Sequence, residues 1–303
     1  PCLAVELSAQ NLMARHLGMQ EPGALGWAPL AAAGRWWADA AFENTDGVGV
    51  LPYGKAPPEA ADALHRQLQV QPRWLQDQLE LLDVPETCTV VLDTPAWPSP
   101  LAQAALRCAD AVLVTLEASA RACADPAAVQ AMLAEATAAP ADQGVLVTRF
   151  DPRRVSHRDA LQALRAQWGE RLIPYTLHED ENIPRALARA MCVGSFAPQA
   201  QSARDLQGVC NWLTGPAWHL RRCWPPEQAG HDGSVGPRRG PARRHPRGTG
   251  HPHLAAPGVG LACTPARSGA RRTLVDVAVA LRGAARHARP RPAALAAAAG
   301  ARA

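Results

Sequence analysis

Asp93 is the residue of this sequence best placed to do chemistry on a ligand. It ends the apolar run Val90-Val91-Leu92 and precedes Thr94-Pro95. A short apolar run is typical of a buried parallel strand, and open α/β sheets bind ligands at the carboxyl ends of such strands. A carboxylate there can organise the water molecules around a Mg²⁺ ion. Asp93 could also be an ordinary helix N-cap, but its context favours the ligand-facing position.

The elements that would position Asp93 alternate between strand and helix patterns. Strands are expected near residues 3–7, 47–52, 88–93, 111–116, 144–148 and 172–175. Helices are expected at residues 9–17, 57–82 (in two pieces broken near Pro72), from 126, from 156, at 183–191 and at 201–213. This alternation predicts an α/β fold with a doubly wound, mostly parallel sheet and helices on both faces.

Three helix details can be predicted from residue types. Asp125 followed by Pro126 is typical of an N-cap and a first-turn proline. Ser156 is expected to cap the helix that follows it. In the last helix, the apolar pattern predicts that the inward-facing residues are Ala203, Leu206, Cys210 and Leu213.

Composition divides the chain into two parts. Residues 1–215 carry 16 Lys and Arg against 24 Asp and Glu, whereas residues 216–303 carry 15 Arg against 3 acids. We therefore expect one α/β domain over 1–215 and a tail over 216–303. The eight Cys form no C-x-x-C pair, which argues against a zinc site or a disulfide framework. The chain shows no signal peptide and no apolar run long enough to span a membrane, so a cytoplasmic protein is expected.

The tail is rich in Arg, Pro, Gly and Ala and is expected to be disordered or the product of a shifted reading frame. A basic arm for nucleic acid or anionic lipid is the alternative. Thr273 to Ala285 could form a short basic helix, too interrupted by Gly283 and alanines to anchor the chain in a membrane. The chain also begins with Pro1-Cys2, inside a predicted strand, from which we expect a missing N-terminal segment.

Several short segments together resemble a known family over about residues 1 to 214. They are Val5 to Leu12 (similar to V-D-x-x-P-Q-N-L), Asp93-Thr94-Pro95 (D-x-P), Val147 to Pro152 (ending like N-x-F-D-P), Leu177 to Glu181, and Val193 to Pro198. Their order and spacing resemble the MinD/ParA-like, deviant-Walker ATPases, and specifically the BcsQ/YhjQ type encoded in bacterial cellulose-synthase operons. The resemblance implies a P-loop NTPase-like fold with ATP and Mg²⁺ as cofactors.

The resemblance gives catalytic roles to Glu6 and Asp93. Asp93 would hold Mg²⁺ through water, and Thr94 in the same motif would contact the cofactor. Glu6 occupies a position where the family generally has Asp, and its extra methylene displaces the carboxylate by more than an ångström, which can cost ~100-fold in rate. A solvated acid at a strand end is an equally weighted interpretation of Glu6.

On the adenine side, the resemblance gives cofactor-binding positions to Thr148, Arg149 and Pro174. Thr148 stands where the family has an Asn, and it lacks the side-chain amide that could donate and accept hydrogen bonds at the adenine edge at the same time. Arg149 and Pro174 could pack on the base, although Pro174 could simply end a strand. His178 and Asp180 are expected in a polar surface loop rather than as a catalytic pair.

The main departure from the family is that no glycine-rich phosphate loop ending in Lys-Ser/Thr occurs in the chain. Without such a loop the triphosphate charge lacks its usual cradle of N–H groups and lysine. We expect this chain alone not to hydrolyse ATP.

The resemblance implies an accessory protein of bacterial cellulose biosynthesis that assists assembly or localisation of the membrane cellulose synthase. It implies cellulose-synthase operon proteins as partners, a nucleotide-dependent homodimer, and a cytoplasmic protein recruited to the inner membrane. Two alternatives are a non-catalytic interaction module and a ParA-like protein that positions DNA or other cargo through its basic tail. We expect no specific nucleic acid partner and no direct membrane anchor.

Overall fold

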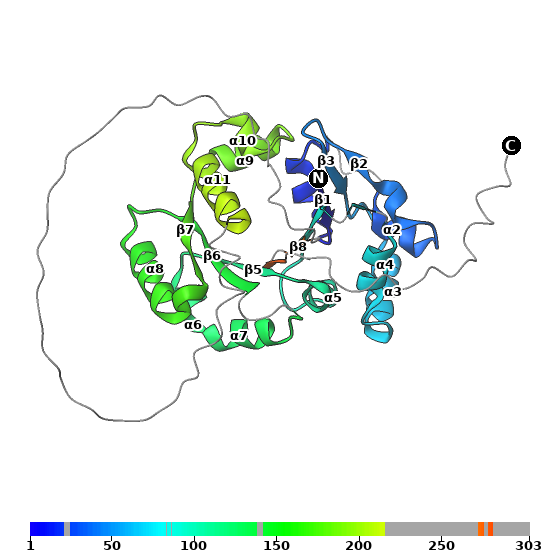
Figure 1. Ribbon diagram of the computed structural model, residues 1–303, viewed down its shortest axis with the longest axis horizontal. Helices are drawn as coiled ribbons and strands as arrows, with labels where there is room; N and C mark the ends of the chain where they lie inside the picture. The colour runs from blue at the N-terminus through cyan, green and yellow to red at the C-terminus, as the bar shows by residue number, and fades with distance from the viewer. Residues whose placement is uncertain are drawn as a thin grey trace, which may run out of the picture.

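The computed structural model describes residues 1–20, 25–82, 84–85, 87–137 and 142–215, together with the backbone of 272–275 and 278–280. Within these residues, strands alternate with helices in chain order (Figure 1). None of the described helices is long and apolar enough to span a bilayer.

The first sheet has the strand order β2-β3-β1-β4-β8. Strand β1 (Cys2–Glu6) lies between β3 (Val48–Leu51) and β4 (Thr89–Asp93) and is parallel to both. The short β2 (Phe42–Glu43) pairs antiparallel with β3 at one edge. At the other edge, β8 (Arg272–Val275) runs parallel to β4.

The second sheet has the order β7-β6-β5-β9. Strands β5 (Val112–Glu117), β6 (Gln143–Phe150) and β7 (Leu172–His178) are parallel, and β9 (Ala278–Ala280) pairs antiparallel with β5. Because five of the seven strand pairs among the described residues are parallel and helices connect the parallel strands, the predicted doubly wound, mostly parallel α/β fold is confirmed.

Helices cover both faces of these strands, with α9 to α11 and α6 to α8 on opposite sides of β5–β7 (Figure 1). The helices are α1 (Leu12–His16), α2 (Trp27–Ala32), η1 (Trp37–Ala40), α3 (Pro58–Val70), α4 (Trp74–Leu81), α5 (Pro100–Cys108), α6 (Ala120–Ala124), α7 (Pro126–Ala134), α8 (Val155–Trp168), η3 (Gly169–Arg171), α9 (Asn182–Ala188), α10 (Val193–Phe196) and α11 (Gln201–Thr214).

An aromatic cluster fixes the helices that cover β1. The Trp27 ring meets the Tyr53 and Trp37 rings edge-on, with centroids 5.2 and 5.8 Å apart. Trp74 from α4 lies 6.1 Å from the Trp27 ring. Edge-to-face aromatic pairs stabilise a fold beyond the free energy gained by burying their apolar surface. This cluster therefore holds α2, η1 and α4 against the sheet.

Three predictions about helices are wrong. Ser156 does not cap α8, because the helix begins at Val155. In α11 the prediction holds for Leu213, which is buried, but Cys210 is exposed, Ala203 and Leu206 are only partly buried, and the other buried residues are Ser202, Asp205 and Val209. The helix is rotated in this way because Asp205 turns inward to bind β7. The helix expected over 273–285 is not formed where the structure describes this segment, since 273–275 and 278–280 lie in strands. The rest of 216–303 lies outside the described residues.

Candidate functional site

Glu6 and Asp93 lie side by side at the carboxyl ends of neighbouring parallel strands. They are register partners in the β1–β4 pair, and the Leu7 N–H donates to the Asp93 carbonyl at 2.7 Å. Thr94, the next residue, is buried. The structure therefore brings together the two carboxylates expected to be catalytic and one expected cofactor contact.

The Glu6 side chain is completely buried, and only one of its two carboxylate oxygens accepts a well-formed hydrogen bond from the described residues. Its Oε2 accepts a hydrogen bond from the Ala14 N–H at 2.8 Å, which ties it to the start of α1. Its Oε1 meets no donor of ordinary hydrogen-bond geometry in the part of the chain that the structure describes. The interaction of Glu6 with Asp93 is therefore weaker than a well-formed hydrogen bond. An unsatisfied buried carboxylate oxygen beside a second carboxylate is a place where a cation or a proton is stabilised.

Burial raises the pKa of the Glu6 carboxyl above its ordinary value of 4.5, and contacts with Asp93 and with the amides of residues 12–14 offset this only in part. A carboxyl with a raised pKa in the folded state contributes stability that is complete below pH 4.5 and is lost as the pH rises through the raised pKa.

Replacing Glu6 with Gln is expected to stabilise the fold at high pH only. The amide keeps an acceptor for Ala14 and removes the buried charge, so we expect a gain of roughly 1 kcal/mol at pH 8 and none below pH 4.5. Urea unfolding at both values measures the gain. The exposed Glu43, changed to Gln, should show no such difference. An equal gain at both pH values would contradict the burial argument.

Asn11 holds the end of β3 beside this pair. In a left-handed conformation (φ 52°), it accepts from the Gly54 N–H at 2.8 Å and donates to the Gly54 carbonyl at 3.2 Å. This clamp places Lys55, the sole lysine of the chain, exposed beyond the same carboxyl edge. Sequence reasoning did not single out either residue, although Asn11 belongs to the first motif of the resemblance.

The spacing Gly49…Gly54-Lys55 fits G-x-x-x-x-G-K, but it is no phosphate loop. Gly49 is paired with Leu3 inside β3 rather than in a loop. Ala56 replaces the Ser or Thr that would contact Mg²⁺, and prolines 57 and 58, at the start of α3, have no N–H to offer a phosphate. Lys55 can supply charge at this edge but no cradle of N–H groups.

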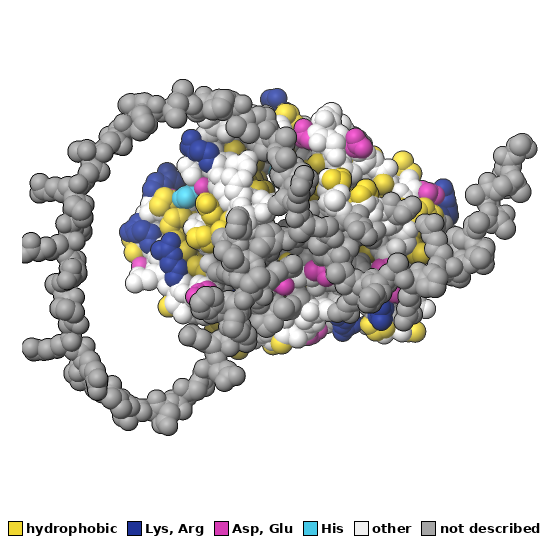
Figure 2. Space-filling view, in the orientation of Figure 1, with side chains coloured by type: hydrophobic (Ala, Val, Ile, Leu, Met, Phe, Trp, Pro, Cys, Tyr) yellow, Lys and Arg dark blue, Asp and Glu magenta, His cyan; other side chains and the backbone are white. Residues whose placement is uncertain are grey.

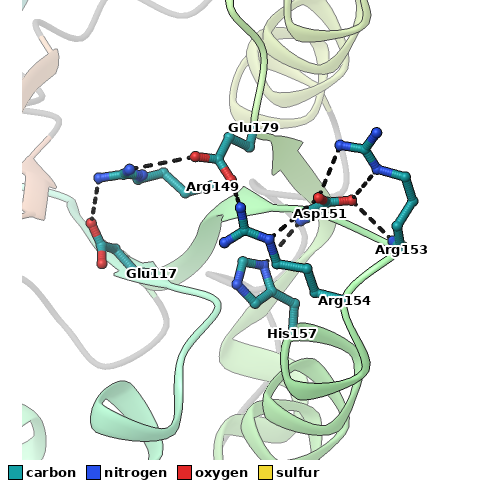
Figure 3. Close-up of polar contacts among 7 residues, drawn as sticks. All are labelled: Glu117, Arg149, Asp151, Arg153, Arg154, His157 and Glu179. Atoms are coloured by element: carbon teal, nitrogen blue, oxygen red, sulfur yellow. Dashed lines mark hydrogen bonds and ion pairs between the residues drawn. The ribbon is translucent and has the colours of Figure 1, made fainter.

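On the second sheet, Arg149 bridges the ends of the other parallel strands (Figure 3). Its guanidinium contacts Glu117, at the end of β5, at 3.2 Å and Glu179, just after β7, at 3.5 Å. Arg149 has a left-handed backbone (φ 53°), which is uncommon for a residue other than glycine and occurs most often at functional positions. Thr148 donates from its Oγ1 to the Leu116 carbonyl at 3.4 Å. Thr148 and Arg149 therefore lie at one edge.

Pro174 does not reach this edge. Phe150 pairs with His178 at the carboxyl end of β7, and Pro174 lies four residues earlier, which is roughly 13 Å away along a strand. Pro174 is exposed. We therefore leave it out of the candidate site.

The turn after β6 is a network of arginines around Asp151. Arg153 hydrogen-bonds both oxygens of Asp151, and these bonds lower the pKa of Asp151 to about 2. Arg154 contacts Asp151 at 3.5 Å and Glu179 at 3.8 Å. Figure 2 shows Lys and Arg side chains gathered over the end of the molecule that carries α8 and β7. This turn places positively charged side chains beside Arg149, which shares Glu179 with Arg154.

His178 is not free in a surface loop, because Asp205 on α11 binds it twice. One Asp205 oxygen lies 2.9 Å from both the His178 N–H and the His178 ring Nδ1, and the other accepts from Gln201 at 2.7 Å. Asp180 instead accepts from Asn182 and Ser202. The sequence offered no signal for this pair, because the two partners lie 27 residues apart.

Replacing Asp205 with Ala is expected to cost about 1–3 kcal/mol of unfolding free energy, because the His178 N–H and Gln201 lose a buried acceptor. Chemical denaturation measures the loss. The exposed Asp159 on α8, changed to Ala, should stay within about 0.5 kcal/mol of wild type. Equal effects at both positions would show that the pair does not hold β7 to α11.

The two carboxylates of the Glu6–Asp93 pair suit Mg²⁺ better than a metal ion that takes all of its ligands from protein side chains. The described residues hold no group of three or more His, Cys, Asp or Glu able to ligate a metal. Magnesium keeps several waters and uses one or two carboxylates plus the phosphates of a nucleotide. The unsatisfied Oε1 of Glu6 and the neighbouring Asp93 meet that requirement.

Comparisons with known proteins identify the family and the fold. A family profile described as "Cellulose biosynthesis protein BcsQ" matches residues 1–214. McdA from Cyanothece is 18% identical with a TM-score of 0.54, covering 69% of this chain and 87% of its own. A putative plasmid partition protein from Borrelia burgdorferi B31, bound to AMPPNP, is 13% identical with a TM-score of 0.56, covering 73% and 86%.

A third structure, the septum site-determining protein MinD from Pyrococcus horikoshii OT3 complexed with Mg-ADP, is 17% identical with a TM-score of 0.53, covering 73% of this chain and 85% of its own. At these identities the structures share the fold. No similar sequence was found among curated proteins. Since the profile spans about two thirds of the sequence, the chain belongs to the cellulose biosynthesis protein BcsQ family.

Proposed function

We propose that this chain is an accessory protein of bacterial cellulose biosynthesis that responds to a magnesium-bound adenine nucleotide. The observation that carries the proposal is the Glu6–Asp93 pair at the carboxyl ends of adjacent parallel strands. The family name supports the cellulose role, and two neighbours of the same fold are bound to Mg-ADP and to AMPPNP.

In this proposal, Asp93 and Glu6 have different roles in holding the metal ion. Asp93 is the more accessible of the two and would orient waters of the Mg²⁺ shell. Glu6, buried and held by Ala14, has one oxygen without a well-formed hydrogen bond and would support Asp93 in holding the metal ion. When bound, Mg²⁺ neutralises phosphate charge, which the two carboxylates alone would repel.

The opposite end of the edge would receive the base. Arg149, held by Glu117 and Glu179, presents a flat guanidinium on which an adenine ring can stack, and Thr148 offers a hydroxyl. Because the Thr148 hydroxyl already donates to Leu116, recognition of the base edge would be weak.

We propose that the chain does not turn over ATP by itself, because neither its sequence nor its described residues provide a phosphate cradle. Steady-state phosphate release from Mg²⁺-ATP is the test, with background rates expected. Turnover clearly above background that Asp93→Ala abolishes would refute this point and would leave the nucleotide site in place.

The role in cellulose biosynthesis is tested by co-purification of the full chain with cellulose-synthase subunits. Retention of these subunits is expected, and nucleotide-dependent self-association would separate a switching homodimer from a non-catalytic interaction module. The ParA-like alternative predicts salt-dependent DNA binding that disappears when Arg238, Arg239, Arg243 and Arg244 become Gln. DNA binding of that kind without retention of synthase subunits would overturn the proposal.

A further inference from the structure

A polar pocket lies near the amino ends of β6 and β7, at the opposite end of the second sheet from Arg149. Its volume is about 580 Å³, and it is lined by side chains of α7, the end of α8 and η3, namely Gln130, Gln167, Trp168, Glu170 and Arg171. Arg171 directly precedes Leu172, the first residue of β7, which pairs with Val145 near the start of β6. A volume of this size is typical of a small-molecule site.

Trp168, the last residue of α8, has a buried indole N–H without an acceptor. Its ring packs into the main core of the protein. Its Nε1 meets no hydrogen-bond partner in the part of the chain that the structure describes. Buried donors of this kind are rare in native folds, and one that persists calls for an explanation such as a water, an ion or a ligand that supplies the acceptor.

The other side chains of the pocket supply both donors and acceptors. Gln167 donates from its Nε2 to the Cys123 carbonyl at 3.0 Å, which fixes its amide group at the pocket. Gln130 brings a second side-chain amide from α7, and each amide carries donors and an acceptor. Glu170 and Arg171 carry opposite charges, which cancel. The lining therefore offers hydrogen bonds of both kinds and no net charge.

A neutral molecule with several hydroxyl groups matches this lining best. A hydroxyl group donates one hydrogen bond and accepts others, so one ligand can satisfy donors and acceptors of the lining together. Its oxygens can accept from the Trp168 indole and from Arg171, while its hydrogens can be donated to Glu170. An anion would be attracted by Arg171 but repelled by Glu170, and the reverse holds for a cation.

We propose that this pocket binds a sugar, as a monosaccharide or a short oligosaccharide, and that Trp168 Nε1 donates to one of its oxygens directly or through one water. The pocket contains neither Glu6 nor Asp93 and lies away from the carboxyl ends of the strands. The inference therefore does not depend on nucleotide binding and would survive its failure.

Nitrogen–proton correlation NMR of the full chain, titrated with glucose and with cellobiose, tests the proposal at the indole N–H itself. The Trp168 signal, identified by its loss in Trp168→Phe, should shift and saturate. We expect a Kd of about 1 mM or tighter for the better sugar, as for a few hydrogen bonds with little apolar burial. Trp37 is the matched control, because it is also buried with an unpartnered Nε1 among the described residues but does not line this pocket. Its signal should not move.

Two arginine variants test the lining independently of the tryptophan. Arg171→Leu should weaken sugar binding roughly 10-fold or more, as for the loss of one hydrogen bond to a charged group. Arg165→Leu, at an exposed position of α8, should bind as the wild type does. A Trp168 signal that neither sugar moves, or sugar binding that survives both Trp168→Phe and Arg171→Leu, would overturn the proposal. A stronger response of the Trp168 signal to inorganic phosphate than to either sugar would also overturn it, because the pocket would then be an anion site.

Discussion

Replacing Trp27 with Ala is expected to destabilise the protein by about 3–5 kcal/mol, the usual cost of truncating a fully buried large aromatic side chain. Trp27 has no exposed surface, and its ring packs on Tyr53, Trp37 and Trp74. Its indole Nε1 also donates to the Glu6 carbonyl at 2.6 Å. The substitution therefore removes core packing and the tie that fixes the Glu6 end of β1. Thermal and urea unfolding measure the loss.

Trp36 provides the matched control for Trp27. It lies beside the aromatic cluster but is 41% exposed, and among the aromatic rings of the described residues it meets the Trp37 ring, edge-on at 6.4 Å. Trp36→Ala should cost about 1 kcal/mol, the value of one edge-to-face pair. If both substitutions cost the same, the cluster does not anchor the Glu6 strand in the way we describe.

Replacing Gly54 with Ala is expected to cost about 2–5 kcal/mol, because the added Cβ is strained and also overpacked. Gly54 has a φ of +82°, and a Cβ would lie 2.6 Å from the Gly26 Cα. The obstructing atoms belong to backbone, so no side chain can move aside. The clash would push Gly54 away from Asn11, which holds it by two hydrogen bonds, and would displace Lys55 from the edge of the site.

Gly34 separates the two causes of this loss. It also has a positive φ of +67°, but a Cβ there would meet nothing within 4 Å. Gly34→Ala should show the strain alone, about 1–2 kcal/mol. Unfolding free energies from urea denaturation compare the two. Equal losses would mean that the close approach of the Gly26 and Gly54 backbones is not a constraint.

The parallel strands and the strand-end position of Asp93 could be predicted from local pattern, whereas the role of Glu6 was implied only by the family resemblance. Short apolar runs that end in an acid are sufficient to identify β1 and β4, since burial on both faces removes polar residues from them. Their pairing with each other is a finding of the structure. The prediction that Asp93 lies at the carboxyl edge of the sheet therefore rested on a local feature, an apolar run that ends in an acid.

Other features depend on contacts between distant segments, which a single sequence does not display. The inward position of Asp205 arises from a hydrogen bond to a strand 27 residues away, which overrides the apolar pattern of α11. The Asn11–Gly54 clamp joins residues 43 apart. The pattern of 272–280 is compatible with either helix or strand, and in the structure 272–275 and 278–280 are strands that pair with β4 and β5.

The arrangement of charge along the carboxyl edge explains why nucleotide binding would need a metal. Glu6 and Asp93 lie at the carboxyl ends of strands in the first sheet, and Glu117 and Glu179 lie at those of the second, where Arg149 is already shared between them. A triphosphate alone would be repelled by the carboxylates at its reactive end. A Mg²⁺ ion reverses the local sign of charge, so the pair that repels ATP would attract Mg²⁺-ATP.

Calorimetric titration of the full chain with Mg²⁺-ATP, and with ATP in the presence of EDTA, tests the central claim most directly. We expect binding only with Mg²⁺, weakened roughly 10-fold or more in Asp93→Asn, as for the loss of one hydrogen bond to a charged group. Asp159→Asn should bind as the wild type does. An affinity for Mg²⁺-ATP that Asp93→Asn leaves unchanged, or no binding by the wild type, would contradict the assignment of this carboxylate pair.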